Sequence, residues 1–468
     1  MRILVVGCGA AGATAAQFAR KIDRQAEVVV LTRESYGEYS KCGLPYALSG
    51  VVPGFDSLVE YPPAWFRRFG IDLRCDTEVT GIDPVGHSIT TVALLDGNEE
   101  RLEYDSLILA TGAKSKIPHT PGALREDGTL QHGIFTLRTM DDARAIGESM
   151  RTASSGMIVG SGLIGMEMAE AMAERGIDTY VRLRTHVLTG MVDEDIARMI
   201  EGVAETKGIR FIRRTTVSAI RVDDGIEVTL RNLDTDAESQ HPVKMAIISA
   251  GANSETTLAA TAGCAIAESG GIAVDSHCRT SVHGIYAAGD CTAYPDFVTG
   301  QPTQVGLGSI AVRQGRVAGT CAAGGDEGLP EGLLNARTTC LFGLEIAAVG
   351  PTLIQLRQAG IEPVVGKVAG STRPDYFPGG TPITVKVLAH PEDGRILAAQ
   401  IVGVEGAHLR VNTLAAAILN RMTVGEFVQM ETCYAPPAAP TLDCMTLAAD
   451  AANIKQKRAS QRGANKGD

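Results

Sequence analysis

Two glycine-rich fingerprints constrain the fold of this chain more than any other feature. The first occupies residues 7–12, after an apolar, β-branched run at 2–6 and before a stretch with helical spacing. The second occupies residues 160–165, after a similar run at 157–160. A strand, a tight glycine turn and a helix N-terminus in this order bind the pyrophosphate of a dinucleotide. One such motif is weak evidence, but two in this context predict an α/β fold with two Rossmann-like, dinucleotide-binding domains.

The residues after each fingerprint predict which dinucleotide binds. The strand after the first should end in an acid that binds the ribose, ~20 residues past the glycines. Thr32 and Arg33 stand near that slot, so Glu34 is the candidate. The strand after the second fingerprint carries no acid but places Arg182 and Arg184 on one face. Arginine there accommodates a 2′-phosphate, which favours NADPH over NADH, unless both arginines are solvated strand-end residues.

A single cysteine, Cys42, lies just beyond the first fingerprint. Pro45 follows it and fits the first turn of a helix. The dipole of such a helix would favour a thiolate, which is the reactive form of cysteine. Two nucleotide sites around one placed cysteine indicate electrons that pass from one bound cofactor, through another, to sulfur. The alternative is a structural cysteine.

The composition limits the partners and the location. A chain of 468 residues suggests about three domains. Its 43 basic and 54 acidic residues, net -11, argue against nucleic acid as the main partner. The first residues are already a core strand, and no apolar run could cross a bilayer, so we expect a cytoplasmic protein. The ten cysteines form no CxxC pairs, which predicts reduced, mostly buried thiols and no metal site.

Further motifs along the chain carry a family resemblance. They are Cys42-Gly43-Leu44-Pro45-Tyr46, Ala110-Thr111-Gly112, Glu167 after the second fingerprint, and residues 286–290, 375–379 and 434–437. Together they resemble the FAD-dependent pyridine nucleotide-disulfide oxidoreductases, most of all the single-cysteine coenzyme A disulfide reductases and their persulfide- and polysulfide-reducing relatives. The resemblance extends to about Ala452. It implies a glutathione-reductase-like fold, with a C-terminal α+β dimerisation domain after the two Rossmann-like domains.

The resemblance also implies domain boundaries. Residues 1–112 and 256–325 would form the two parts of the FAD-binding domain, and 113–255 the NAD(P)H-binding domain with its connecting segments. Residues 330–452 would form the dimerisation domain. Residues 453–468 are polar and rich in lysine and glycine, which predicts a flexible tail.

The same resemblance implies where the cofactors bind. FAD would lie on the first fingerprint, with Asp290 bonded to its ribityl chain and the helix starting near Leu307 directed at the flavin pyrimidine. NADPH, or NADH, would lie on the second. The residues expected to contact a cofactor are Gly7, Gly9, Ala10, Ala11, Gly12, Glu34, Ala110, Thr111, Gly112, Gly160, Gly162, Leu163, Ile164, Gly165, Glu167, Arg182, Arg184, Gly251, Gly289, Asp290, Gly308 and Ser309.

Several departures from relatives bear on the chemistry. Glutathione-reductase-like members carry a CxxxxC pair, but no second cysteine lies five positions from Cys42. The His-Pro general acid is also missing, which nominates Tyr434 and Tyr376 as proton donors to the leaving thiol; aromatic packing at a dimer seam is the alternative. Ala10 stands where related NADH oxidases and peroxidases place a histidine, which disfavours an oxidase or peroxidase function.

The substrate is less well defined by the sequence. Glu38 and Lys41 replace a serine and an asparagine of coenzyme A disulfide reductases and would change the mouth of the site, where Lys41 is a candidate substrate-binding residue. Arg20 and Lys21 match positions that meet coenzyme A phosphates in relatives, or they are solvated helix residues. Cys433, with Cys444 eleven residues on, could resolve a mixed disulfide across a dimer interface or bind a soft metal, or be an inert buried thiol.

The sequence therefore predicts a homodimeric flavoenzyme. NADPH would reduce FAD, the flavin would reduce the mixed disulfide of Cys42, and the freed thiolate would attack a low-molecular-weight disulfide, persulfide or polysulfide. One alternative is an NAD(P)H oxidase or peroxidase in which Cys42 cycles through a sulfenate. Another is a flavoprotein that passes electrons to a ferredoxin-like protein, against which the acidic composition counts mildly.

Overall fold

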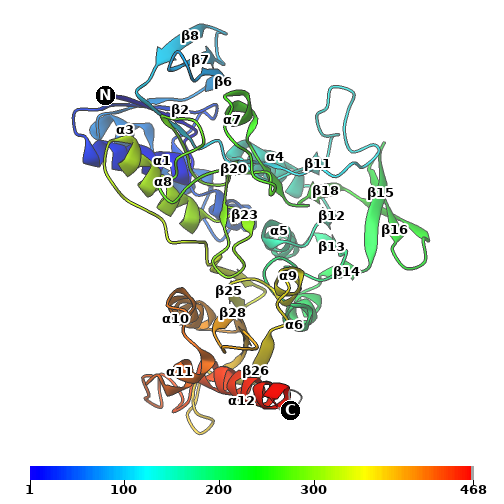
Figure 1. Ribbon diagram of the computed structural model, residues 1–468. Coiled ribbons are helices and arrows are strands. Elements are labelled where there is room, and N and C mark those ends of the chain that lie inside the picture. The colour runs from blue at the N-terminus through cyan, green and yellow to red at the C-terminus, as the bar shows by residue number, and fades with distance from the viewer. Residues whose placement is uncertain (465–468) are drawn as a thin grey trace.

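The structure is a computed structural model that describes residues 1–464 (Figure 1). Its first sheet is parallel throughout, with the strand order β21 (Ile285–Ala287), β9 (Ser106–Leu109), β1 (Arg2–Val6), β2 (Glu27–Leu31) and β5 (Ile71–Arg74). These strands are rich in buried valine, leucine and isoleucine, as in parallel sheets that are covered on both faces. Strand β21 comes from far along the chain, so the chain returns to complete this sheet.

Helices α1 (Ala10–Ile22) and α8 (Gly308–Ala322) lie side by side against the first sheet (Figure 1). A Cβ atom on Gly315 would lie 2.3 Å from the carbonyl oxygen of Ala11, and one on Gly319 would lie 2.1 Å from that of Ala15. The two glycines therefore allow the helices to approach closely. Helix α8 begins at Gly308, which confirms the predicted helix start near Leu307.

The second sheet is also parallel. Its strand order is β11 (Ile134–Phe135), β18 (Met245–Ile248), β12 (Ser155–Val159), β13 (Asp178–Arg182) and β14 (Arg210–Ile212). Helices α4 (Met140–Met150), α5 (Leu163–Glu174) and α6 (Glu194–Thr206) share its hydrophobic core. Thr139 caps α4 in a reciprocal capping box with Asp142, which fixes where this helix begins.

Small antiparallel sheets accompany both parallel sheets. One contains β6 (Thr77–Asp83), β7 (Ser88–Ala93) and β8 (Glu99–Glu103), and another contains β15 (Thr215–Val222), β16 (Ile226–Asn232) and β17 (Glu238–Val243). Strands β10 (Ala113–Ser115) and β19 (Ala252–Ser254) pair where the chain leaves the first unit and returns to it. The other short elements are β3 (Glu38–Tyr39), η1 (Lys41–Gly43), α2 (Leu44–Ser49), η2 (Phe55–Leu58), β4 (Val59–Tyr61), α3 (Pro63–Arg68), α7 (Thr257–Thr261), β20 (Ile272–Ala273), β22 (Thr292–Pro295), β23 (Pro302–Gln304) and α9 (Leu353–Gln358).

The C-terminal part is an antiparallel sheet covered by helices. Its strand order is β24 (Arg337–Leu341), β25 (Leu344–Val349), β28 (Ile396–Gly403), β27 (Pro382–Ala389) and β26 (Val364–Ser371). Helices α10 (Ala407–Leu419), α11 (Val424–Gln429) and α12 (Cys444–Ala464) pack on it. In Figure 1 this part lies at the opposite end of the molecule from the first sheet. The three sheets confirm the predicted fold class.

The C-terminal segment differs from its expected form. Residues 453–464 of the predicted flexible tail belong to α12, and residues 465–468 lie outside the described residues. The helix continues because its earlier turns pack against β26, where Gly366 admits the backbone of Ala448, and because Lys455 donates to the carbonyl oxygen of Val365 at 2.8 Å. Within residues 1–464, no helix combines the length and apolar character needed to cross a membrane.

Candidate active site

The two glycine fingerprints fold into nearly identical turns. Gly7 and Gly160 have φ values of 104° and 124°, a region that side-chain-bearing residues rarely adopt. A Cβ atom on Gly7 would lie 2.2 Å from the carbonyl oxygen of Ala110, and one on Gly160 would lie 2.3 Å from that of Ser249. Both positions therefore require glycine, because the neighbouring strand passes too close for any side chain.

The second and third glycines of each turn complete a cradle. At Gly9 and Gly162, a Cβ atom would meet no described atom within 4 Å. These glycines are the N-caps of α1 and α5 and offer no capping side chain, so the first N–H groups of each helix remain available to an anion. A Cβ atom on Gly12 would lie 1.9 Å from the carbonyl oxygen of Gly7, and one on Gly165 would lie 2.3 Å from that of Gly160. The third glycine of each turn therefore packs directly against the first. Both cradles thus fit a dinucleotide pyrophosphate; the other first-turn residues that were predicted to contact it are Ala10, Ala11, Leu163 and Ile164.

Cys42 lies in the short helix η1, immediately before α2, and is exposed. Partial burial of the thiol raises its pKa, and the carboxylates of Glu167 and Asp290 raise it further, while Arg138 acts in the opposite direction. Burial and the two carboxylates therefore oppose the thiolate that we expected the helix end to favour. Cys42 therefore lies within electrostatic range of Glu167, which follows the second fingerprint on α5, and of Asp290, which follows β21.

Glu167 connects the second fingerprint to the C-terminal sheet. Its carboxylate accepts a hydrogen bond of 3.0 Å from the hydroxyl of Thr339 on β24. Burial, together with the charge of Glu170, raises the pKa of Glu167 to about 7. Glu167, Tyr46 and Cys340 line a cavity of about 190 Å³ between α2, α5 and β24. Burial likewise raises the pKa of Tyr46 to about 12.

Asp290 lies just after β21, close to the N-terminus of α1. Its carboxylate forms an ion pair of 3.1 Å with Arg138, and its carbonyl oxygen accepts the hydroxyl of Ser254 at 2.7 Å. The N–H of Gly289 donates to the side chain of Gln314 on α8 at 2.8 Å, which ties this turn to that helix. The other residues predicted here also lie where segments join. Ala110 directly follows the buried strand β9, and the hydroxyl of Thr111 donates to the carbonyl oxygen of Glu255 at 2.6 Å. Gly112 and Gly251 adopt positive φ, and Gly308 and Ser309 are the first residues of α8.

The candidate ribose-binding acid, Glu34, is engaged within the loop that leads to Cys42. One oxygen of Glu34 accepts the hydroxyl of Tyr39 at 2.5 Å, and the other pairs with Lys41 at 2.7 Å. The Tyr39 hydroxyl in turn accepts the N–H of Met140 at 3.0 Å. The charge of Lys41, next to Cys42 in the chain, is therefore already paired with that of Glu34. Glu38, on the other face of this loop, is buried, and burial raises its pKa to about 7.

The two arginines after the second fingerprint lie at the end of β13. Arg182 is its last residue, and Arg184 follows two positions later, so both project from the same side of the strand. The Nε atom of Arg182 is buried and finds no hydrogen-bond partner within residues 1–464. Burial and the charge of Arg184 lower the pKa of Arg182. Two adjacent cations, one of them incompletely paired, fit an anion such as a 2′-phosphate.

The basic residues at the end of α1 differ in how they are used. Arg20 donates to the carbonyl oxygens of Ala26, at 2.9 Å, and of Phe69, at 3.3 Å, so it ties α1 to neighbouring loops. Lys21 is exposed, and its ammonium lies 4.3 Å from the centre of the Phe18 ring. Lys21 is thus the better placed of the two to meet an external anion.

Tyr376 and Tyr434 come from separate loops of the C-terminal part and meet. Their hydroxyls lie 3.0 Å apart, and the side chains remain exposed. Tyr376 lies between β26 and β27, and Tyr434 between α11 and α12. Their hydrogen bond raises the pKa of Tyr376. The structure thus brings together the two tyrosines that the sequence nominated as proton donors.

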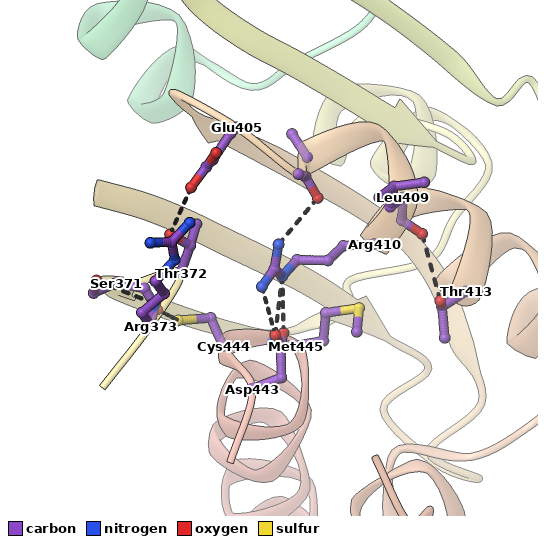
Figure 2. Close-up of polar contacts among 12 residues, drawn as sticks. Ser371, Thr372, Arg373, Glu405, Leu409, Arg410, Thr413, Asp443, Cys444 and Met445 are labelled. Atoms are coloured by element: carbon purple, nitrogen blue, oxygen red, sulfur yellow. Dashed lines mark hydrogen bonds and ion pairs between the residues drawn. The ribbon is translucent and has the colours of Figure 1, made fainter. Parts of the chain in front are cut away.

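A buried ion pair anchors the segment that carries Tyr434. The guanidinium of Arg410 on α10 donates hydrogen bonds of 2.7 to 3.1 Å to the carboxylate of Asp443, which precedes α12 (Figure 2). Asp443 also accepts the N–H of Met445 at 2.9 Å, so it fixes the start of α12 as well. In the same segment Cys433 is exposed, whereas Cys444 is buried next to the carbonyl oxygen of Ser371. Six of the ten cysteines are buried, which agrees with the prediction that most of them are.

Three residues of the site were not predicted from the sequence. Arg138, Tyr39 and Thr339 touch Asp290, Glu34 and Glu167, respectively, and none of the three belongs to a motif. The capping signal at Thr139 predicts a helix start but not the direction of the side chain before it. Arg138 and Thr339 meet their partners only because distant segments pack together.

Comparisons with known proteins agree with this geometry. The pyridine nucleotide-disulphide oxidoreductase family matches residues 1–315, and the dimerisation domain of that family matches residues 336–445. An NADH oxidase of Methanocaldococcus jannaschii is 34% identical over 454 residues, which are 96% of this chain and 98% of the relative. An NAD(P)H coenzyme A polysulfide/persulfide reductase of Pyrococcus horikoshii is 30% identical over 446 residues, 94% of this chain and 96% of the relative. Among solved structures, an NAD-dependent persulfide reductase from A. fulgidus has a TM-score of 0.91 at 29% identity and covers 98% of this chain and 84% of its own.

Proposed function

Since the chain belongs to the pyridine nucleotide-disulphide oxidoreductase family, and is thus an FAD- and NAD(P)H-dependent oxidoreductase, we propose that it reduces a low-molecular-weight disulfide, persulfide or polysulfide through Cys42. The observation that carries the proposal is the position of this thiol. Cys42 is exposed, and its ionisation responds to Asp290 beside the first cradle and to Glu167 beside the second. A thiol placed there could receive electrons from a flavin bound at the first cradle and react with a substrate that approaches from solvent.

The two cradles and Cys42 would each have a separate role in this reaction. FAD, bound at the cradle of Gly7 to Gly12 and near Asp290, would supply two-electron transfer between the nicotinamide and sulfur. The cradle of Gly160 to Gly165 would hold the nicotinamide dinucleotide, and Arg182 would select NADPH by binding its 2′-phosphate. Cys42 would attack one sulfur of the substrate as a thiolate, so that a mixed disulfide forms and one thiolate leaves.

Protonation of the leaving thiolate is assigned to the C-terminal tyrosines. A dimerisation-domain match over residues 336–445 supports a homodimer. The family resemblance implies that this part of one subunit would complete the site of the other. Tyr376 and Tyr434 lie on exposed loops of this part, with their hydroxyls paired at 3.0 Å. A paired phenol can donate its proton while the second hydroxyl stabilises the phenolate that remains.

One observation favours a second candidate, an NADH oxidase. The M. jannaschii relative, at 34% identity, bears that name. Ala10 opposes this candidate, because a methyl group there can neither donate nor accept a proton for peroxide chemistry. We therefore rank the reduction of a sulfur substrate first.

Replacement of Cys42 with serine tests the proposal. We expect the variant to retain FAD but to lose NADPH-dependent reduction of coenzyme A disulfide, coenzyme A persulfide and polysulfide. The control is Cys75→Ser, a half-buried thiol outside the site, which should retain activity. Turnover of a sulfur substrate by the Cys42 variant at more than a small fraction of the native rate would refute the mechanism. Rapid oxygen consumption without sulfur reduction in the native enzyme would favour the oxidase.

A further inference from the structure

The turn before α4 contacts both sides of the Cys42 site. On one side, Arg138 pairs with Asp290 at 3.1 Å. On the other, the N–H of Met140 donates to the Tyr39 hydroxyl, three residues before Cys42. Residues 138–140 thus connect the loop that carries the thiol to the strand end that carries Asp290.

This turn is rigid enough to position a side chain. The carboxylate of Asp142 accepts the N–H groups of both Arg138 and Thr139 at 2.9 Å, and the Thr139 hydroxyl accepts the N–H of Asp142 at 3.1 Å. The backbone of Arg138 is therefore held by the capping box of α4. About three quarters of the Arg138 side chain is buried, at 24% exposure, as is that of Asp290, at 26%.

The charges around the sulfur give this arginine a specific task. Glu167 from α5 and Asp290 from beyond β21 raise the pKa of the Cys42 thiol, whereas Arg138 lowers it, and Arg138 is the group that pairs with Asp290 at 3.1 Å. Two of them are anionic when ionised and one is cationic. Without Arg138, a forming thiolate would face two carboxylates with no compensating charge from this set.

We propose that Arg138 is a positioning residue: it holds the Asp290 carboxylate and supplies the positive charge against which the Cys42 thiolate forms. The proposal rests on the proposed function only in taking Cys42 as the reactive thiol. It differs from a purely structural role, because a structural residue would not change how the reactivity of Cys42 depends on pH.

The test is alkylation of Cys42 in the FAD-loaded enzyme by iodoacetamide, followed peptide by peptide across pH 6 to 10. We expect Arg138→Met to slow alkylation about tenfold near pH 7 and to move the midpoint upward, because an opposite charge nearby typically lowers such a pKa by one unit or more. Arg138→Lys should restore most of the reactivity. Arg144→Met is the matched control: Arg144 lies on α4, pairs with Asp56 at 3.3 Å, and should leave the profile unchanged.

A second neutral variant, Arg138→Gln, separates charge from packing. Unchanged midpoints in both neutral variants would overturn the proposal, as would an equal loss of reactivity in Arg138→Lys. Loss of FAD from both neutral variants with an unchanged midpoint would show a purely structural role for Arg138 and would likewise overturn the proposal. No electron acceptor enters this assay, so failure to reduce any sulfur substrate would refute the proposed function and leave the result for Arg138 standing.

Discussion

Replacement of Gly319 with alanine tests how the first cradle is held in place. Gly319 lies in the last turns of α8, where a Cβ atom would be 2.1 Å from the carbonyl oxygen and 2.8 Å from the carbonyl carbon of Ala15 on α1. Neither atom can move without moving the helix backbone. Because Cβ atoms in proteins rarely approach closer than 3 Å, the two helices must separate by about 1 Å.

The expected cost follows from two opposing terms. Overpacking of a core contact costs about 1–3 kcal/mol and sometimes more, whereas alanine gains about 1 kcal/mol over glycine in a helix interior. Since backbone rather than a flexible side chain must yield, we take the upper end, which leaves a net loss of about 2 kcal/mol. A domain of roughly 150–250 residues loses about 2–4 °C in its midpoint of thermal unfolding per kcal/mol, so the midpoint should fall by about 4–8 °C.

The control is the same substitution at Gly202, in the middle of α6. A Cβ atom there meets no described atom within 4 Å, so Gly202→Ala should gain up to about 1 kcal/mol. Differential scanning calorimetry on both variants, with the ratio of FAD to protein measured by absorbance, gives the comparison. We expect Gly319→Ala alone to lose FAD, because α1 and α8 flank the first cradle. If both variants shifted upward, the close helix contact would not limit stability and the reasoning would be wrong.

The remaining predictions concern the second cradle and the tyrosine pair. Arg182→Glu should raise the Michaelis constant for NADPH far more than that for NADH, and a native enzyme that already prefers NADH would contradict the assignment. Phenylalanine at both Tyr376 and Tyr434 should slow thiol release by ~10²-fold in stopped-flow experiments while flavin reduction by NADPH stays unchanged. Equal slowing of both steps would show that the tyrosines support the fold or a cofactor instead.

Much of the fold could be predicted from the sequence because the glycine fingerprints record local steric limits. Gly7 and Gly160 need positive φ, and Gly12 and Gly165 need the absence of a side chain, whatever the rest of the chain does. The apolar strands before them then specify parallel sheets. Such constraints act over a few residues, so they are visible in one sequence.

The parts of the site that could not be predicted depend on contacts between distant segments. Arg138 reaches Asp290 across 152 positions, and Thr339 reaches Glu167 across 172. Nothing local marks either partner. The engagement of Glu34 by Tyr39 and Lys41 also follows from how the loop folds back on itself, not from the spacing after β2. The extension of α12 into the expected tail depends likewise on packing against β26.

The opposite charges around Cys42 lead to a last prediction that is separate from the test of Arg138. Burial raises the pKa of Glu167 to about 7, so this carboxylate is largely protonated below pH 6 and charged above pH 8. Its charge disfavours a thiolate at Cys42. Glu167→Gln should therefore alkylate at the native rate below about pH 6 and faster than native above pH 7, with the thiol midpoint moved downward. Removal of a cation and removal of an anion would then shift the same midpoint in opposite directions. A shift in the same direction for Glu167→Gln and Arg138→Met would mean that local disorder, rather than charge, controls the thiol, and would refute the electrostatic account of this site.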